Sequence, residues 1–322
     1  MIYLFVLCFL SFWSCTSEDP AATPEYAASS KIPLRVGWQQ TWATQGQLAV
    51  ILQQSTILQE LGFSPVFVGF SYGAPLNEAA LAGEVDVLFT ADQPALALCS
   101  RDRRWKMIGR LMYNRVGTFV PLSSPIHTVA DLKGKTIAIP FGAAAHRETL
   151  EAIKKAGLDP KKDVQTINMG IVDIATAAQG NSWTAIDAAS AWDPIYADLE
   201  SKKIVRSVAS GTVTSLVVMN QGYATTYPDS PSRVLEALQL AYVQYKSDTN
   251  QANEHFITAS NLSFSKAALD LAASVEPNLQ PKNNISVELS SQDRINIQNA
   301  ADFMVSAGLL SQSLDSKECF WD

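Results

Sequence analysis

An alternation of strand-like and helix-like segments constrains this chain most. Short β-rich apolar runs are each followed by a run with helical spacing, and Gly62 ends the first helical run. The alternation covers residues 34–37, 48–61, 66–68, 74–82, 85–89 and 92–98. Because strands joined by helices run in the same direction, this βαβαβ order predicts a mainly parallel sheet flanked by helices.

A second α/β series follows a break at Ser123-Ser124-Pro125. Two strands are expected before the break, at 106–111 and 117–122, and the strands after it at 136–140, 164–168, 185–188, 204–208 and 215–219. From Ser230 onward the apolar spacing is helical, and no internal sequence repeat is visible. Helices without strands of their own should pack on the first sheet, which makes the first domain discontinuous.

Length and composition agree with two α/β lobes. The chain has 322 residues, of which 47% are hydrophobic, enough for sizeable cores. We expect lobe I to comprise residues 31–120 and 217–322, and lobe II to comprise residues 121–216.

The N-terminal segment has the pattern of a secretory signal. Residues 2–14 are almost wholly apolar and lead to Cys15. This run is shorter than the ~20 residues that span a bilayer, which favours a cleaved signal. We expect a lipoprotein-type signal peptide at 1–15, lipidation of Cys15, and a flexible tether at 16–30. The protein would then lie in the periplasm or at the outer face of the membrane; with Cys15 unmodified it would be secreted and soluble.

Charge and cysteine content exclude several classes of protein. The net charge of -7 disfavours a nucleic-acid partner, because phosphate contacts need clustered Lys and Arg. After the signal, Cys99 and Cys319 remain, and they either form a disulfide in an oxidising compartment or stay as separate buried cysteines. With three histidines and no metal-ligand spacing, neither a metal site nor a cofactor is expected.

Four short segments, spread over nearly all of the mature chain, carry a family resemblance. They are residues 34–38, 81–87 before 90–94, 131–147, and 186–188 leading to 192–194. Leu-Ala-Gly-Glu-Val-Asp, followed one domain later by Ile-Asp-Ala and Trp-Asp-Pro, is similar to the paired loops of nitrate/sulfonate/taurine-type solute-binding proteins of ABC importers. The Trp-Asp-Pro form looks most like the aliphatic-sulfonate branch.

That resemblance implies a type 2 periplasmic-binding-protein fold with a two-strand hinge and ligand capture between the lobes. It also implies a monomeric binding protein without catalytic activity, whose partners are a small solute such as a sulfonate or taurine and an ABC permease in the membrane.

The candidate ligand residues all lie where a strand ends and a loop or helix begins, which is where ligands bind in open α/β sheets. They are Trp38, Gln39, Thr41, Trp42, Ser71, Tyr72, Gly73, Thr90, Asp92 and Gln93 from the first lobe, and Gly142, Ala143, Ala144, Ala145, Arg147, Trp192 and Asp193 from the second. Backbone N–H groups in the helix turn after Gly142 can hold a sulfonate, and Trp42 and Trp192 can cover its aliphatic stem. Trp38 and Trp42 can equally be core residues.

Several charged residues have two interpretations. Arg147 adds charge to the site if it points inward. Asp193 either meets a ligand ammonium or caps the following helix. His146 is expected at the surface, and Asp86 and Asp187 are expected to be structural partners of turns near the hinge.

Alternative functions remain open from the residues alone. Gly69-Phe70-Ser71-Tyr72-Gly73 matches a nucleophile elbow and predicts a secreted Ser71 esterase, but only His127, His146 and His255 can complete a triad and no oxyanion loop precedes the motif. A pyrimidine-precursor synthase of the same superfamily lacks support from a histidine/cysteine cluster. Among binding proteins, nitrate, bicarbonate and a thiamine-related pyrimidine or other heterocycle are further candidate solutes.

Overall fold

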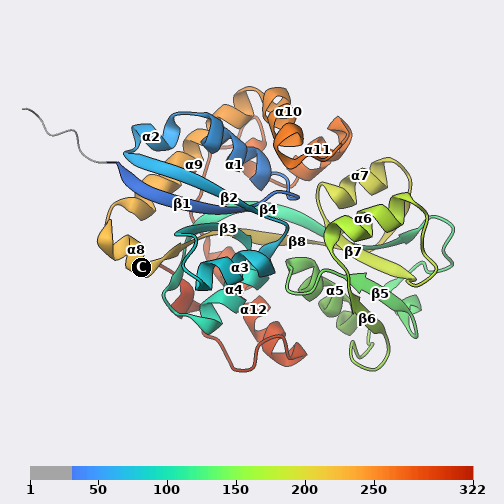
Figure 1. The fold of residues 1–322 in the computed structure, drawn as a ribbon. Coiled ribbons are helices and arrows are strands. Elements are labelled where there is room, and N and C mark those ends of the chain that lie inside the picture. Colours follow the sequence, from blue (N-terminus) through green and yellow to red (C-terminus); the bar gives the residue numbers. More distant parts are fainter. Residues whose placement is uncertain (1–30, 322) are drawn as a thin grey trace, which may run out of the picture. The chain divides into compact units, whose positions relative to one another are not determined.

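One sheet of eight strands runs through residues 31–321, the part of the chain that the computed structural model describes (Figure 1). The strand order is β2-β1-β3-β8-β4-β7-β5-β6. β1 is parallel to β2 and β3, and β5 is parallel to β6 and β7, whereas β8 and β4 run antiparallel to their neighbours. The strands are β1 (Ile32–Gln39), β2 (Phe63–Phe70), β3 (Val87–Ala91), β4 (Trp105–Pro121), β5 (Thr136–Ile139), β6 (Gln165–Asn168), β7 (Ala188–Trp192) and β8 (Val205–Asn220).

Helices cover both faces of this sheet (Figure 1). They are α1 (Gln45–Gln54), α2 (Ile57–Glu60), α3 (Gly73–Leu81), α4 (Asp92–Arg101), α5 (Ala144–Lys155), α6 (Ile171–Gln179), α7 (Ile195–Ser201), α8 (Gln221–Thr226), α9 (Ser230–Ser247), α10 (Thr249–Ser260), α11 (Lys266–Ala273) and α12 (Ser291–Ala307), with short 3-10 turns η1 (Val129–Leu132), η2 (Pro277–Leu279) and η3 (Ser316–Cys319). No described helix is both long enough and apolar enough to cross a membrane. The expected signal peptide, the lipidation of Cys15 and the tether all fall outside the described residues.

β4 and β8 are each one long strand, so the expectation of two shorter strands in each place was wrong. In β4, polar residues interrupt the apolar pattern because they reach buried partners, not because the chain turns. Asn114 Nδ2 donates to the carbonyl of Ala43 (3.2 Å), and Arg115 Nε donates to Asp193 (2.8 Å). A polar pair inside a strand was thus misread as a strand end.

The expectation of a single helix at 48–61 was also wrong, because the structure has two helices in this segment. α1 ends at Gln54, where Ser55 is extended and its N–H donates to the carbonyl of Ile51 (2.9 Å). α2 ends before Gly62, whose φ of +87° lies in the left-handed region that favours glycine. Gly62 therefore ends the helical segment, as the sequence predicted, but after a break.

The element order of β1–β4 recurs in β5–β8, although the sequence shows no repeat. The backbone N–H of Arg35 donates to Asp86 Oδ2 (2.8 Å), and that of Thr136 donates to Asp187 Oδ2 (2.9 Å), with a sequence separation of 51 in both cases. Asp86 and Asp187, just before β3 and β7, thus have the expected structural role, but they bind the backbone of strands β1 and β5 and not turns. If each strand of β1–β4 is exchanged with its counterpart in β5–β8, the strand order of the sheet reads the same in reverse, so the two series are arranged symmetrically.

The helices after β8 pack against the β1–β4 part of the sheet. Tyr242 of α9 is fully buried and its hydroxyl donates to the carbonyl of Leu111 in β4 (2.7 Å). On the other face, Met304 of α12 packs with Leu96 of α4 in a buried apolar cluster. Cys99 and Cys319 lie in the same cluster and form a disulfide that links α4 to η3.

Candidate functional site

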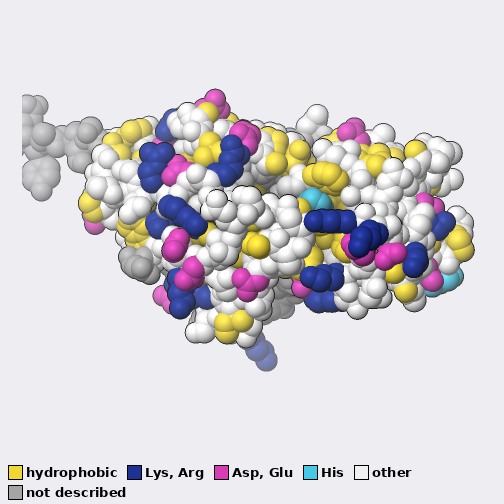
Figure 2. Space-filling view, turned by 90° about the horizontal axis from the view of Figure 1, so that it is seen from below, with side chains coloured by type: hydrophobic (Ala, Val, Ile, Leu, Met, Phe, Trp, Pro, Cys, Tyr) yellow, Lys and Arg dark blue, Asp and Glu magenta, His cyan; other side chains and the backbone are white. Residues whose placement is uncertain are grey.

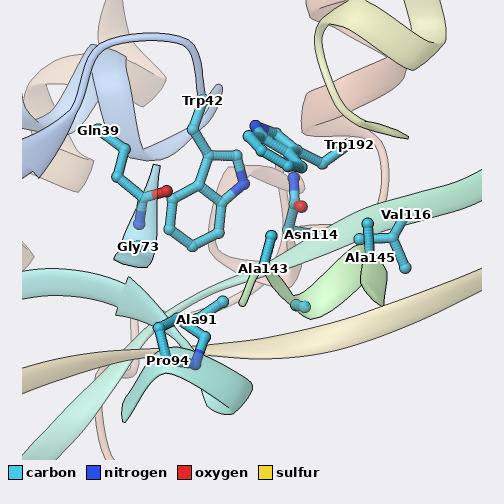
Figure 3. Close-up of a pocket in the computed structure, with 11 residues that line it drawn as sticks. Gln39, Trp42, Gly73, Ala91, Pro94, Asn114, Val116, Ala143, Ala145 and Trp192 are labelled. Atoms are coloured by element: carbon cyan, nitrogen blue, oxygen red, sulfur yellow. The ribbon is translucent and has the colours of Figure 1, made fainter. Parts of the chain in front are cut away.

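A narrow cavity lies where the two series of strands meet, at the carboxyl ends of β1, β3 and β7 (Figure 3). Its volume is about 20 Å³, close to the space that one water molecule needs. It is lined by Gln39, Trp42, Gly73, Ala91, Pro94, Asn114, Val116, Ala143, Ala144, Ala145 and Trp192. Any solute larger than water therefore requires these walls to separate.

Two tryptophans form the aromatic walls of the cavity. Trp42 follows β1 and Trp192 ends β7, and Figure 3 shows both indole rings extending toward the same space, with Asn114 between them. Both side chains are at least 96% buried, since their exposed fractions are 2% and 4%. In the part of the chain that the structure describes, neither indole N–H has a hydrogen-bond partner. Because an unpaired buried donor costs about 1–3 kcal/mol, these two groups are poised to donate to a ligand.

The N-terminal end of α5 forms a third wall. Gly142, with φ of +82°, turns the chain after β5, and Ala143 is extended before the helix begins at Ala144. The amides of Ala144 and Ala145 belong to the first helical turn, where N–H groups have no partner within the helix and the helix dipole is positive. The small side chains at 143–145 allow a ligand to approach these amides closely.

The glycine at the start of α3 also reflects close packing around the cavity. A Cβ at Gly73 would lie 2.7 Å from the side chain of Pro94, which is shorter than real contacts. Glycine at this position therefore lets α3 approach the beginning of α4, and the two residues together form part of the cavity wall.

Two buried aspartates stand next to the cavity, and arginines engage both. Asp92 binds Arg147 (2.7 Å), which also contacts Glu148 and Glu151. Asp193 binds Arg115 through both carboxylate oxygens (2.8 and 3.2 Å) and accepts the N–H of Ala197 in α7 (2.9 Å). Desolvation raises the pKa of both carboxyl groups, to about 6 for Asp193, while the arginines oppose that rise.

These contacts narrow the interpretations of the charged residues. Asp193 is engaged on both oxygens and binds the first turn of α7, as the capping interpretation requires. Arg147 is buried among three carboxylates and does not line the cavity. Its N–H donates to Gln93 Oε1 (2.9 Å), so α5 is tied to α4 twice.

The expectation that His146 lies at the surface was wrong. Its side chain is only 8% exposed and stacks on Phe141 at 4.5 Å between ring centroids. Burial lowers the pKa of His146 to about 4, and Nδ1 accepts the N–H of Gly142 (3.4 Å), which requires the neutral ring.

Of the predicted ligand residues, the structure gathers seven around the cavity. They are Gln39, Trp42, Gly73, Ala143, Ala144, Ala145 and Trp192. The others are not among the lining residues; they are Trp38, Thr41, Ser71, Tyr72, Thr90, Asp92, Gln93, Gly142, Arg147 and Asp193. Trp38 is buried in the core, and Thr41 Oγ1 donates to the carbonyl of Ser71 (2.8 Å).

Four lining residues were not predicted. Ala91 and Pro94 flank predicted residues and have no chemical signal of their own. Asn114 and Val116 lie in the middle of β4, which the sequence divided into two strands. A polar residue next to Arg115, within the segment predicted as a break between two strands, was the one signal that pointed to Asn114.

A match to a family described as NMT1/THI5 like covers residues 73–252. A relative named "Putative aliphatic sulfonates-binding protein" from Escherichia coli (strain K12) is 31% identical over 192 residues, which cover 58% of this chain and 57% of that protein. The chain therefore spans little more than half of that relative. A "Putative binding protein" from Brucella abortus (strain 2308) is 25% identical over 310 residues, 92% of each chain.

Solved structures share the architecture. The alkanesulfonate-binding protein SsuA from Xanthomonas axonopodis pv. citri, bound to MOPS, superimposes with a TM-score of 0.76 at 24% identity, covering 91% of this chain and 99% of that one. The periplasmic aliphatic sulphonate binding protein SsuA from Escherichia coli gives 0.72 at 23% identity over 91% and 93%. These likenesses establish the predicted periplasmic binding protein fold, and the family match confirms the resemblance drawn from the sequence. The chain belongs to the NMT1/THI5-like family.

Proposed function

We propose that this protein is the solute-binding component of an ABC importer and that its solute is an aliphatic sulfonate. The observation that carries the proposal is the chemistry of the cavity. Its walls offer the indole N–H groups of Trp42 and Trp192 and the first-turn amides of Ala144 and Ala145, together with apolar surface. A sulfonate has several strong acceptors and no donor, so it complements this set of groups.

The relatives support the same solute class. The Escherichia coli relative carries aliphatic sulfonates in its name, and the Xanthomonas structure is described as bound to MOPS. An ammonium-bearing sulfonate such as taurine fits less well, because Asp92 and Asp193 are both engaged by arginines. We therefore favour an alkanesulfonate over taurine.

The mechanism we propose is closure of two lobes. Lobe I would comprise residues 31–120 and 217–322 and lobe II residues 121–216, with β4 and β8 as the hinge because only these two long strands connect the parallel ends of the described sheet. The small cavity then corresponds to closed lobes, and separating them admits the solute. A ligand that contacts both lobes shifts the equilibrium toward closure.

We place the protein in the periplasm or on the outer face of the membrane, with a permease as partner. The relatives support this location, since one is named a "Putative ABC transporter periplasmic binding protein", from Brachyspira hyodysenteriae. A lipid anchor at Cys15 remains part of the proposal.

The Ser71 esterase receives no support from the contacts. Ser71 is exposed, and among the described residues no hydrogen bond joins its hydroxyl to a histidine. His146, one of three candidates, stacks on Phe141 instead.

A thermal-shift panel tests the proposal. Saturating ethanesulfonate should raise the melting temperature, because ligand at 100 times its Kd stabilises the native state by about 2.7 kcal/mol. Taurine, nitrate, bicarbonate and a thiamine-related pyrimidine should give smaller shifts, and Trp192→Ala should abolish the ethanesulfonate shift. A larger shift with the pyrimidine or nitrate would replace the assigned solute, and Ser71-dependent hydrolysis of a p-nitrophenyl ester would overturn the binding function.

A further inference from the structure

A second and much larger groove lies between α5 and α12, away from the cavity. Its volume is about 720 Å³, within the range of about 300–1,000 Å³ that small-molecule sites occupy. One wall comes from α5 and the loop that follows it, and the other from α12 and Leu309. Figure 2 views the protein from the side of these helices and shows hydrophobic side chains gathered beside Lys and Arg.

The groove has an aromatic and aliphatic lining. His146, Leu150 and Lys154 are spaced four residues apart on α5, so they share one face of that helix. Phe141 stacks on His146 from the same side, and Phe303 of α12 stands opposite. Because the pKa of His146 is lowered to about 4, its ring is neutral at pH 7 and adds no charge.

Two lysines at the groove differ from their chain neighbours. Lys155 pairs with Glu151 (2.9 Å) and Lys162 pairs with Asp159 (3.2 Å). Within residues 31–321, Lys154 and Lys161 have no carboxylate within salt-bridge distance.

The same two lysines are held at the groove by the opposite wall. Lys154 Nζ lies 5.6 Å from the ring centroid of Phe303 and donates to Ser306 Oγ (3.3 Å). Lys161 Nζ lies beside Gly308, 3.1 Å from where a Cβ would stand. The groove therefore combines apolar walls with two lysines that form no salt bridge in the described chain, and the carboxylate of Asp159 at its edge is paired with Lys162.

We propose that this groove is a second binding site, for an amphiphilic organic anion with an aromatic or branched apolar body and one anionic head. The body would pack between Phe141, Leu150 and Phe303, and the head would lie between Lys154 and Lys161. The inference is independent of the solute in the first cavity. α5 borders both the groove and the first cavity. An occupant of the groove that bridges α5 and α12 therefore favours the arrangement in which these two helices are close.

Calorimetric titration of the full chain with 2-naphthoate and with uncharged 2-naphthalenemethanol tests the site. We expect 2-naphthoate to bind and the alcohol to bind at least about tenfold more weakly. The carboxylate can form charge-assisted hydrogen bonds with the two lysines, and these are stronger than hydrogen bonds between a lysine and a neutral hydroxyl. The double variant Lys154→Gln/Lys161→Gln should lose about tenfold in affinity for 2-naphthoate. The control Lys155→Gln/Lys266→Gln removes two exposed lysines that do not line the groove and whose carboxylate partners do not line it either, and it should bind as the wild type does.

Four results overturn the inference. They are the absence of measurable 2-naphthoate binding, equal binding of the alcohol, an equal loss in the control variant, and a loss of binding in Trp42→Ala/Trp192→Ala that the Lys154/Lys161 variant does not share. The last result would place 2-naphthoate in the first cavity.

Discussion

The series β1–β4 and β5–β8 place equivalent elements around the cavity but give them different side chains. After the first strand of each series stand Trp42 and Ala143, and at the end of the third strand stand Ala91 and Trp192. All four line the cavity. At these two equivalent positions, each series thus contributes one indole and one alanine, in exchanged order. The repeated backbone arrangement determines where the site lies. The exchange of large and small side chains between equivalent positions makes the two sides of the site different.

The aspartates that follow the third strands, Asp92 and Asp193, differ in how their ion pairs are supported by the sheet. Both ion pairs join the two series. Asp92 at the start of α4 pairs with Arg147 of α5, and no strand pairing joins these two helices, whereas Asp193 pairs with Arg115 of β4, a strand that is already hydrogen-bonded to β7. The Asp92–Arg147 pair therefore connects parts of the two series that no strand pairing joins, whereas the Asp193–Arg115 pair adds to the existing pairing of β4 with β7. Removal of each arginine should separate these two roles.

The largest expected effect is on stability. Arg115→Met and Arg147→Met should each lower the free energy of unfolding by about 3–5 kcal/mol, because each leaves a buried carboxylate without its partner. Arg147→Met alone should also increase the radius of gyration measured by small-angle X-ray scattering. The exposed pair offers the control: Arg101→Met, which loses only Glu78, should change stability by less than about 1 kcal/mol.

Equal radii of gyration in the two arginine variants would contradict the comparison, since Arg147 would then not hold the series together. Urea unfolding of each variant supplies the stability values.

A smaller effect on stability is expected from a change in pH. Two residues at equivalent positions in the two series, Gln45 and His146, allow the comparison. Gln45 in α1 accepts the N–H of Gln39 (2.7 Å), as His146 in α5 accepts that of Gly142, but only His146 titrates. Its pKa of about 4 lies below the unfolded value near 6.5, so the unfolded state binds the proton more tightly. Stability should therefore fall by about 3 kcal/mol as pH drops from about 6.5 to 4.

His146→Gln, which imitates Gln45, should lack this part of the pH dependence, whereas the exposed His127→Gln should keep it. Unfolding at several pH values measures both. An unchanged profile in His146→Gln would show that other groups cause the loss.

Next in size is the effect of the two indole donors. Trp42→Phe and Trp192→Phe keep an aromatic ring but remove the N–H, and each should weaken ethanesulfonate binding about tenfold. Trp183 is the control, because its indole N–H is also buried without a partner in the described chain but does not line the cavity. Calorimetry should show no change for Trp183→Phe; a loss in only one of the cavity variants would mean that one series alone donates.

The smallest effect concerns the backbone donors of α5. Ala144→Pro removes one N–H at the first helical position, where proline is tolerated and the preceding Ala143 is already extended. We expect affinity for ethanesulfonate to fall about fivefold, because Ala145 still donates. Lys266→Pro at the start of α11 repeats the change away from the cavity and should leave affinity unchanged. If the Ala144→Pro variant binds ethanesulfonate as tightly as the wild type does, the amide of Ala144 does not contact the solute.

The sequence predicted the sheet class and the loops of the site because both depend on local patterns. Apolar runs mark the strands, and loops follow them at 40–44 and 140–143. The continuity of β4 depends on partners far away in the chain, such as Asp193 for Arg115, and no local pattern encodes it. His146 stacks on the nearby Phe141, but the local spacing does not distinguish this contact from an exposed position. The repeat was hidden for the same reason, since equivalent positions such as Trp42 and Ala143 differ in size and chemistry.

The most direct measurement is a crystal structure with 2-bromoethanesulfonate, located by the anomalous signal of bromine. We expect bromine between Trp42 and Trp192, with sulfonate oxygens about 2.7–3.2 Å from the amides of Ala144 and Ala145. Bromine outside this cavity, with the cavity unchanged, would contradict the claim that these residues capture the solute.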